Sequence, residues 1–571
     1  MSRLAEGFAA GYACLSAWAD LLDRINVFPV ADGDTGANLR ISLAPLRACG
    51  LDQAMVASQM VRCATGNSGN IAAAFFSGLL AAQCVDDLAP QAAEGRMRAR
   101  RAVAVPQDGT MLSVFDSLSE ILARCAPPLA ASSCETILTA LQQTVLTTAQ
   151  TLPDCRSAGV VDAGALGMYI FFDGFFRSVT GQGGKSPSLF ALFPGRLAVA
   201  ADFHPPATEA YCVDAILQSA DGSLLSQAAV AELGESVVIV PEHSRLKIHI
   251  HTADPRQLRA RLAGLGEVVG WSDEPLAISS EGSGLDPVPR GCLRIMTDAA
   301  GSLPRDLARH HRITLLDSYI LSGDMARPET LCVPETIYGL MRQGHRVTTA
   351  QASLAERHQH YQSVCEEYGR TLYLCVGSAF TGNYGAAVSW QREQDTNNLL
   401  EVIDTGAASG RLALIALLTS RVAERTESAE AVRAHALNLV NTCREYIFID
   451  TLRYLVAGGR VSKAGGFFGD LLHLKPVISP TREGVRRVGM VRNREAQLDF
   501  ALDKAGTEIE VSTRAVLLLQ YSDNQAWVNE VARPQLRAFL PQAEILVVPL
   551  SLTSGVHMGP GTWSLAFAEA A

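Results

Sequence analysis

The feature that most constrains the fold is a change in hydrophobic periodicity along the chain. Up to about residue 180, apolar residues recur at helical spacing, and hardly any segment alternates as a strand does. From about residue 206, runs such as 211–218 and 246–252 alternate or are rich in β-branched residues, which predicts strands. From residue 292 onward, such runs alternate with amphipathic segments, which predicts α/β layers around a largely parallel sheet.

We therefore expect a multidomain protein, because 571 residues exceed what one hydrophobic core usually serves. Stretches rich in Gly, Ser and Pro at 180–188 and 279–291 mark the boundaries. The predicted domains are an all-α domain over 1–182, a small α+β domain over 204–283 and an α/β domain over 291–571.

Composition argues against some classes of function. The net charge of −10 disfavours nucleic acid as the main partner, because a phosphate backbone favours a basic surface. No apolar run has the length of a membrane-spanning helix, and the first residues lack the basic start and apolar core of a signal peptide. The 13 cysteines show no framework spacing, which is typical of reduced thiols and predicts a cytoplasmic protein.

An acidic loop within INVFPVADGDTGANL (25–39) is the first candidate site. Asp32 and Asp34 flank Gly33, and two carboxylates this close in the chain suit a shared cation. Carboxylate oxygens are ligands that Mg²⁺ prefers when it also holds phosphate, and Asn26 could add a further polar group. The alternative is a solvated Asp-Gly turn, since this dipeptide is common in turns.

Three further loops of small and polar residues precede predicted helices: ATGNSGN (64–70), QDGTM (107–111) and GVVDAGALGM (159–168). Backbone N–H groups at a helix start, with a hydroxyl such as that of Ser68, form an anion site. Together with the acidic loop, they suggest one rim of a helical barrel. Taken singly, each loop is also explained by glycines that allow close helix packing.

A cysteine and two histidines in the middle block form a candidate metal site. His249 and His251 lie on one face of a predicted strand, because side chains alternate along a strand. Cys212, on an earlier strand, could supply a thiolate, and Cys/His/His with an open fourth position is a zinc arrangement of the catalytic type. The alternative is two histidines on a solvated face and an ordinary buried cysteine.

Segments rich in hydroxyls and glycines in the last block form a candidate anion site beside apolar residues such as Phe380. Hydroxyls and N–H groups at strand ends hold anions, and apolar neighbours line pockets. The alternative is that these are turn residues and core aromatics. The cationic run 486–494 is either a solvated face or a docking patch for the acidic kinase part. The segments are TTAQAS (348–353), GSAFTGNYGAA (377–387), the stretch 458–479 and VHMGPGTW (556–563).

The first block resembles the nucleotide-binding domain of the dihydroxyacetone kinase L type, above all the version in the kinase subunit of bacterial fatty acid kinase. The resemblance rests on NVFPVADGDTGANL, GNSG, GTM and GVVDAGALG in the family's order. It implies an all-helical barrel that holds ATP and two Mg²⁺. The implied residues are Asp32 and Asp34 as catalytic metal ligands, and Asn26, Asn67, Ser68, Gly69, Thr110 and Asp162 as cofactor-binding residues.

The other two blocks resemble parts of the same system. The Cys212, His249 and His251 pattern is similar to the middle domain of the kinase subunit, which implies Zn²⁺ near the transferred phosphate and catalytic roles for both histidines. From about residue 292, the motifs resemble the DegV family, which implies two α/β subdomains around a buried acyl chain. The implied substrate-binding residues are Thr349, Ser378, Thr381, Gly382, Arg460 and His557.

Taken together, the blocks predict ATP-dependent phosphorylation of a fatty acid carboxylate to an acyl phosphate within one chain. The expected partners are a nucleotide and a long-chain fatty acid. A homodimer and a downstream acyltransferase are expected on the resemblance alone. Two alternatives stay open: a non-catalytic lipid carrier or regulator, and a kinase of a small carbonyl compound or polyol.

Overall fold

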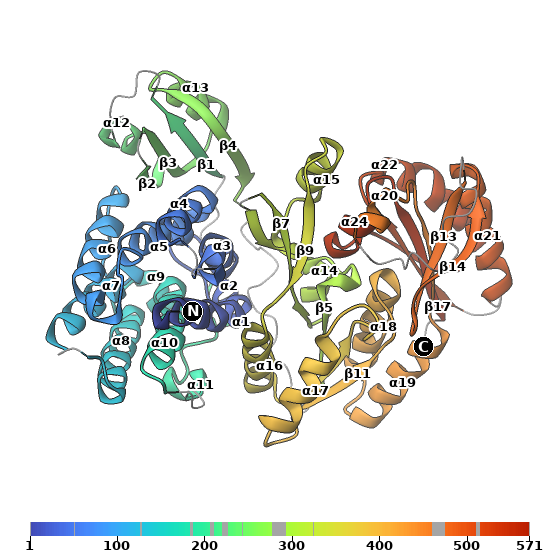
Figure 1. Ribbon diagram of the computed structural model, residues 1–571, viewed down its shortest axis with the longest axis horizontal. Helices are drawn as coiled ribbons and strands as arrows, with labels where there is room; N and C mark the ends of the chain where they lie inside the picture. The colour runs from blue at the N-terminus through green and yellow to red at the C-terminus, as the bar shows by residue number, and fades with distance from the viewer. Residues whose placement is uncertain are drawn as a thin grey trace. The chain divides into compact units, whose positions relative to one another are not determined.

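The computed structural model describes residues 2–48, 50, 52–125, 128–182, 187–205, 210–219, 227–242, 244–276, 293–323, 325–458, 474–509 and 514–569. The chain divides into two compact units, Met1–Pro287 and Val288–Ala571 (Figure 1). Among these described residues, no helix combines the length and the apolar character needed to cross a membrane.

The first unit begins with helices that pack around a central helix, α10 (Ala163–Val179). Nearly all of α10 is buried, including Phe171, Phe172 and Phe175, so neighbours cover it on every side. The other helices of this part are α1 (Arg3–Ala17), α2 (Ala19–Arg24), α3 (Thr35–Leu43), α4 (Gln53–Cys63), α5 (Gly66–Leu79), α6 (Leu88–Ala102), α7 (Met111–Arg124), α8 (Ala131–Thr151), α9 (Pro153–Ala158) and α11 (Leu189–Leu192). The helical character of this block is confirmed, and the closed barrel stays a prediction.

A four-stranded antiparallel sheet follows, in the order β2–β3–β1–β4. One face is apolar and packs on Leu258 and Leu262 of α13, while the other carries Cys212 opposite His251. The elements are β1 (Tyr211–Gln218), α12 (Gln227–Ala231), β2 (Glu235–Glu242), β3 (Arg245–Thr252), α13 (Pro255–Ala263) and β4 (Glu267–Pro275).

A backbone contact joins this sheet to the helices within the first unit. Val103, just after α6, bridges Val238 of β2, and the N–H of Ala104 donates to the carbonyl of Val237 at 3.0 Å. An apolar cluster completes the junction, formed by Val61, Ala74, Ala102, Val238 and Val240. The polar face of the sheet is thereby held against the helical part.

The second unit contains two larger sheets, and helix α18 (Ser409–Ala423) contacts strands of both. The first, β11–β10–β5–β6, is parallel, the second, β14–β13–β12–β17–β15–β16, is mixed, and a small antiparallel sheet has the order β8–β7–β9. The strands are β5 (Arg294–Asp298), β6 (Ile313–Leu316), β7 (Ser318–Ser322), β8 (Met325–Pro328), β9 (Val347–Gln351), β10 (Thr371–Cys375), β11 (Leu400–Asp404), β12 (Arg444–Phe448), β13 (Lys475–Thr481), β14 (Gly484–Val491), β15 (Ala515–Tyr521), β16 (Glu544–Pro549) and β17 (Trp563–Glu569). The helices are α14 (Arg305–His310), α15 (Pro334–Arg342), α16 (Leu354–Tyr368), α17 (Asn383–Glu393), α18, α19 (Ala429–Thr442), α20 (Arg453–Ala457), α21 (Arg494–Glu508), α22 (Gln525–Trp527), α23 (Arg533–Phe539) and α24 (Leu552–Met558).

The expectation of a largely parallel sheet is correct for the first of these sheets and wrong for the second. Among the described strands of the six-stranded sheet, only β15 and β16 run parallel. The last strand, β17, inserts antiparallel between β12 and β15. Strands buried on both faces read as continuous apolar runs, so the residues alone do not reveal the direction of pairing.

Candidate functional site

A cavity of about 400 Å³ lies in the first unit, lined by residues of the helical part and of the sheet. Part of its wall is apolar and includes Val103, Val105 and Val237. The acidic loop, three helix starts and the cysteine–histidine cluster all reach it. The sequence-predicted residues that line it are Asn26, Asp32, Asp34, Asn67, Ser68, Thr110, Asp162, Cys212, His249 and His251.

The acidic loop is held by the side-chain amide of Asn26. Its Oδ1 accepts hydrogen bonds from the N–H groups of Asp34 and Thr35, both at 3.2 Å, and from Thr35 Oγ1 at 2.9 Å. Its Nδ2 donates to the carbonyl of Val30 at 3.1 Å. Gly33, between the two aspartates, has a φ of 69°, a left-handed conformation that favours glycine. Asn26 therefore shapes the loop, because its amide oxygen is already shared among three donors.

The carboxyl groups of Asp32 and Asp34 perturb each other. Burial raises the pKa of Asp32 to about 6, although a hydrogen bond with Asp34 opposes the rise. Burial, followed by the charge of Asp32, raises the pKa of Asp34 well above its ordinary value. Two desolvated carboxylates that resist ionising together are stabilised by a hard divalent cation, so this loop fits Mg²⁺.

The start of α5 offers donors to an anion. Gly66 has a φ of 65°, and a Cβ there would collide with the amide of Asn38. The Ser68 hydroxyl lines the cavity, is buried and has no hydrogen-bond partner among the described residues. An unpartnered hydroxyl at a helix start suits a phosphate oxygen. Gly69 instead faces Ser42 of α3, where a Cβ would meet the hydroxyl, so its role in the fold is close helix packing.

Two further helix starts reach the cavity. Thr110 caps α7 by accepting the N–H of Leu112 at 3.3 Å, and Asp162 caps α10 by accepting the N–H of Ala165 at 2.7 Å. Burial raises the pKa of Asp162 to about 7, although the N–H groups at the start of α10 oppose the rise. This carboxyl group can thus accept or donate a hydrogen bond near neutral pH.

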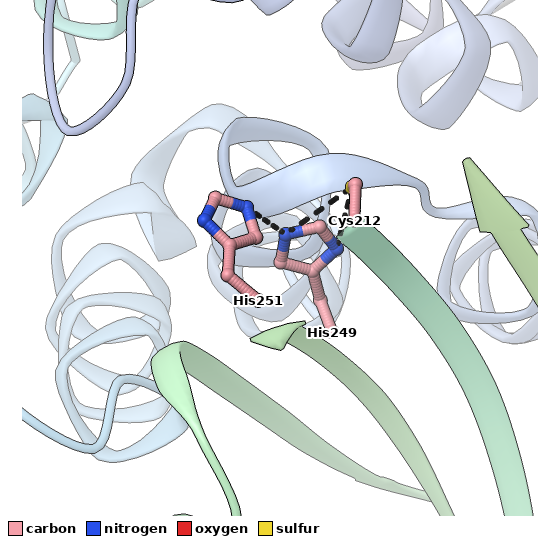
Figure 2. A group of neighbouring side chains, drawn as sticks. All are labelled: Cys212, His249 and His251. Carbon is pink, nitrogen blue, oxygen red and sulfur yellow. Dashed lines mark hydrogen bonds between the residues drawn. The ribbon is translucent and has the colours of Figure 1, made fainter. Parts of the chain in front are cut away.

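Cys212, His249 and His251 point toward one another from the neighbouring strands β1 and β3 (Figure 2). Their ligand atoms all lie within 4.8 Å of one another. Nε2 of His249 is 3.2 Å from Nε2 of His251, and both ring nitrogens of His249 are 3.8 Å from the Cys212 sulfur. A thiolate and two imidazoles at this spacing fit Zn²⁺, with a fourth position left for another ligand.

The surroundings of this cluster favour a cation. Burial, followed by His249, lowers the pKa of His251 to about 4, so this imidazole is neutral near pH 7 and able to ligate a metal. Burial raises the pKa of Cys212, and the charges of Asp214 and Asp34 add to the rise. A nearby cation opposes the effect of those negative charges and favours the thiolate.

Sequence reasoning missed Asp214, which lies between the cluster and α5. Its Oδ2 accepts hydrogen bonds from the Thr65 hydroxyl at 3.0 Å and from the Gly66 N–H at 3.1 Å. Burial by itself would raise the pKa of Asp214, but Lys247 and His249 lower it below its ordinary value. The available signal was its place two residues after the cysteine, on the same strand face.

A second cavity, of about 580 Å³, lies in the second unit. Of the predicted substrate-binding residues, Thr381 and His557 line it, and Thr349 Oγ1 lies 3.1 Å from His557 Nε2. Polar groups are also supplied by Thr553 and Ser554. The charged residues Glu483, Arg486 and Arg487 also line it, the last two from the cationic run 486–494. The apolar part of the wall includes Val376, Phe380, Ile447, Leu455, Ile478 and Met558.

The other predicted residues of this site lie away from the cavity wall or outside the described residues. Ser378 is exposed, and its N–H donates to Asp404 at 3.1 Å. Gly382 immediately precedes α17 and is exposed. Arg460 lies outside the residues that the structure describes. Of the predicted set, the structure thus places Thr381 and His557 on the cavity wall and Thr349 in contact with His557.

A buried carboxyl group that the sequence did not reveal, that of Glu329, holds the start of α24, the helix that carries His557. Glu329 accepts the N–H of Thr553 at 3.0 Å and also its hydroxyl, at the start of α24. Burial raises the pKa of Glu329 to about 8, so the group is largely neutral at pH 7. Gly458 leaves room for the imidazole, because a Cβ there would collide with Nδ1 of His557.

Proteins similar to this chain match about half of it. A DegV domain-containing protein of Caldanaerobacter subterraneus is 25% identical over 279 residues, which are 48% of this chain and 99% of that protein. A protein of Thermotoga maritima named fatty acid-binding protein is 25% identical over 277 residues, which are 47% of this chain and 95% of that protein. A solved structure, described as fatty acid binding of a DegV family protein from Thermus thermophilus, is 26% identical with a TM-score of 0.45 and covers 49% of this chain and 99% of its own.

Three domain families match consecutive parts of the chain. The family described as DAK2 domain matches residues 29–177, and the family of middle domains of the fatty acid kinase type matches residues 208–276. The DegV family matches residues 292–570. In chain order, this protein therefore consists of a DAK2 domain, a middle domain of the fatty acid kinase type and a DegV domain.

Proposed function

We propose that this chain is a fatty acid kinase, which transfers the γ-phosphoryl group of ATP to the carboxylate of a fatty acid held in its own second unit. A carboxylate oxygen attacks the γ-phosphorus, the bond to the β,γ-bridging oxygen breaks, and ADP leaves with the electron pair. The products are an acyl phosphate and ADP. No proton has to move, because a carboxylic acid with a pKa of about 4–5 is already ionised at neutral pH.

The single observation that carries this proposal is the cavity of the first unit, where two clustered carboxylates, a helix start and a thiol–imidazole cluster meet. The N–H groups at Asn67 and Ser68, with the Ser68 hydroxyl, would bind phosphate oxygens. Asp32 and Asp34 would hold Mg²⁺, and a bound Mg²⁺ neutralises part of the negative charge of the phosphates. Their mutual effect on pKa supports such a cation.

The cysteine–histidine cluster fits a second kind of metal. Cys212, His249 and His251 would hold Zn²⁺, which would supply positive charge beside the transferred group. The ligand atoms lie within 4.8 Å of one another, and the cluster lines the same cavity as Asp32 and Asp34. The cations held by these two groups of residues would therefore reduce the repulsion between the fatty acid carboxylate and the polyphosphate of ATP.

The cavity of the second unit supports the acceptor half of the reaction. The apolar part of its wall suits an acyl chain, and the hydroxyls of Thr381 on the wall and of Thr349 beside His557 would donate to the carboxylate. His557 would orient Thr349 across their 3.1 Å contact. The name of the Thermotoga maritima relative, a fatty acid-binding protein, supports this ligand class.

Transfer requires the two cavities to meet, either within one chain or between two copies. Joining both halves in one polypeptide raises the effective concentration of one at the other. A transfer site that excluded water would limit hydrolysis of the reactive anhydride.

The proposal is tested with the full-length chain, ATP, Mg²⁺ and oleate, with hydroxylamine added to trap the acyl phosphate as a hydroxamate. We expect ADP and hydroxamate in equal amounts. Asp34→Ala should lower the rate by on the order of 100-fold or more while oleate still binds, and Thr349→Val should weaken oleate binding while ATP still binds. Asp254→Ala, at an exposed helix cap of the same unit, is the matched control and should leave the rate unchanged.

Three results would contradict the proposal. ATP turnover that is indifferent to oleate would remove the fatty acid as acceptor. Phosphorylation of dihydroxyacetone in its place would identify a kinase of small carbonyl compounds. Binding of oleate without any binding of ATP would identify a lipid carrier.

A further inference from the structure

Asp214 is an acidic residue whose side chain is only 11% exposed and has no direct part in the proposed transfer. It extends from β1 on the polar face of the sheet and reaches the start of α5. There it accepts hydrogen bonds from the Thr65 hydroxyl at 3.0 Å, the Gly66 N–H at 3.1 Å and the Asn70 side-chain amide at 3.2 Å. The carboxylate therefore takes up an N–H group of the same helix start that would bind phosphate.

The same carboxylate also faces the cysteine–histidine cluster. Nδ1 of His249 lies 3.5 Å from its Oδ2, and Nζ of Lys247 lies 3.2 Å from its Oδ1. The other ring nitrogen of His249, Nε2, is the one that lies 3.2 Å from Nε2 of His251. This geometry leaves Nε2 for a metal and gives Nδ1–H a carboxylate acceptor, the arrangement that fixes the tautomer of a metal-ligating histidine.

The charge of Asp214 links these two neighbourhoods. An anion that approaches Asn67 and Ser68 meets a negative charge already present at the start of α5, which is partly neutralised by Lys247. A cation bound at Nε2 of His249 makes the Nδ1–H a stronger hydrogen-bond donor to Asp214. The electrostatic potential at the start of α5 then becomes less negative. The cation and the anion therefore stabilise each other across one carboxylate.

We propose that Asp214 is a positioning residue that couples metal binding at Cys212, His249 and His251 to nucleotide binding at the start of α5. The inference rests on the proposed function only for the identity of the two ligands, and it involves neither the fatty acid nor the transfer step. Each ligand increases the affinity of the protein for the other, and by thermodynamic linkage both factors are equal.

The experiment measures both affinities on the full-length chain after its metals are removed with a chelator. Zn²⁺ affinity is measured by competition with a chromophoric chelator, with and without ADP in excess Mg²⁺. ADP affinity is measured by titration calorimetry, with and without Zn²⁺. For the unchanged chain, we expect each ligand to increase the affinity of the protein for the other by about 5-fold or more.

The isosteric variant Asp214→Asn separates positioning from general damage to the fold. Loss of the acceptor for His249 should weaken Zn²⁺ binding by about 10–100-fold. Loss of the negative charge at the start of α5 should leave ADP binding without Zn²⁺ unchanged or tighter. The coupling factor should fall to about 1. A variant that only damages the fold would weaken the binding of both ligands, so weaker Zn²⁺ binding without weaker ADP binding identifies the role.

Two further variants complete the design. Thr65→Val removes only the hydroxyl on the α5 side, so it should reduce the coupling factor while Zn²⁺ affinity without nucleotide is kept. Asp254→Asn makes the same charge change at the exposed cap of α13 in the same sheet domain and should alter none of the affinities.

The inference is overturned if ADP leaves Zn²⁺ affinity unchanged in the unaltered chain, if Asp214→Asn retains the full coupling factor, or if the chain binds no Zn²⁺. These readouts need no fatty acid. If acyl phosphate forms but Zn²⁺ and ADP binding are not coupled, only the role of Asp214 is contradicted. If Zn²⁺ and ADP binding are coupled but no acyl phosphate forms, only the proposed kinase reaction is contradicted.

Discussion

Asp162 shows how burial tunes a carboxyl group that lines the cavity of the first unit. Its pKa is raised to about 7 by burial, whereas an aspartate in an unfolded chain has a pKa of about 4. Below about pH 3 the group is largely neutral in both the folded and the unfolded state. As the pH rises toward 7, the unfolded chain ionises first, so the folded chain without ligands loses stability by about 1.4 kcal/mol for each pH unit.

Asp162→Asn should remove this pH dependence, because asparagine has no charge to bury and still caps a helix. We expect the melting temperature of the ligand-free variant to approach that of the unchanged chain near pH 4.5 and to exceed it at pH 8. Differential scanning calorimetry at both pH values measures the difference. Asp254→Asn, at an exposed helix cap, is the control. If Asp162→Asn changed the melting temperature by the same amount at both pH values, the explanation would be contradicted.

The sequence predicted those site residues whose chemistry is written within a short motif. Asp32 and Asp34 share one loop, and His249 and His251 share one strand face, so spacing alone suggested their proximity. The same spacing places Asp214 on the strand face of Cys212, but it does not reveal the contacts of Asp214 with Thr65 and Gly66, which lie far away in the sequence. Glu329 could not be found in this way, since a lone glutamate in a sequence is normally exposed.

Among the elements, the pair α1 and α10 shows how glycine controls the distance between helices. Gly11 of α1 faces α10, and a Cβ there would lie 2.7 Å from the backbone carbonyl oxygen of Phe171. A backbone atom in a central helix cannot move aside as a flexible side chain can. The contact therefore depends on glycine at this position, and α10 carries Asp162 at its start.

Gly11→Ala should destabilise the first unit by about 1–3 kcal/mol, because the added methyl group overpacks the interface. Gly339→Ala is the matched control, since Gly339 also lies in a helix, α15, and a Cβ there meets nothing within 4 Å. That change should stabilise the second unit by about 0.5–1 kcal/mol. Denaturant unfolding of both variants measures the two effects, and a neutral Gly11→Ala would contradict the packing argument.

The pairing of the strands was harder to predict than their positions. The runs 211–218 and 246–252 coincide closely with β1 and β3, because alternation is a local property of the sequence. The direction of β17 depends on its neighbours β12 and β15, which lie far away in the sequence. The apolar run of β17 fits either direction equally well. Local pattern therefore fixes the elements, and long-range packing decides the sheet.

The molecule as a whole consists of two compact units, each with its own hydrophobic clusters and its own cavity. A unit that buries its own hydrophobic core can unfold as a separate cooperative transition. A ligand that binds one unit then stabilises that unit alone.

Calorimetry of the full-length chain should therefore show two transitions. ADP with Mg²⁺ should raise only one of them and oleate only the other, each by the equivalent of about 2.7 kcal/mol at a concentration 100 times the dissociation constant. Asp34→Ala should abolish the first shift and keep the second. A single transition that both ligands raise together would show that the units unfold as one.

The second cavity separates two apolar clusters, one containing Val376 and the other containing Ile447, Leu455 and Ile478. An apolar ligand that fills the gap becomes part of the interior and joins them. Copies without it would open more often and expose cleavable backbone, so they would be digested sooner by cellular proteases. The abundance of this protein in a cell would then follow the supply of its ligand.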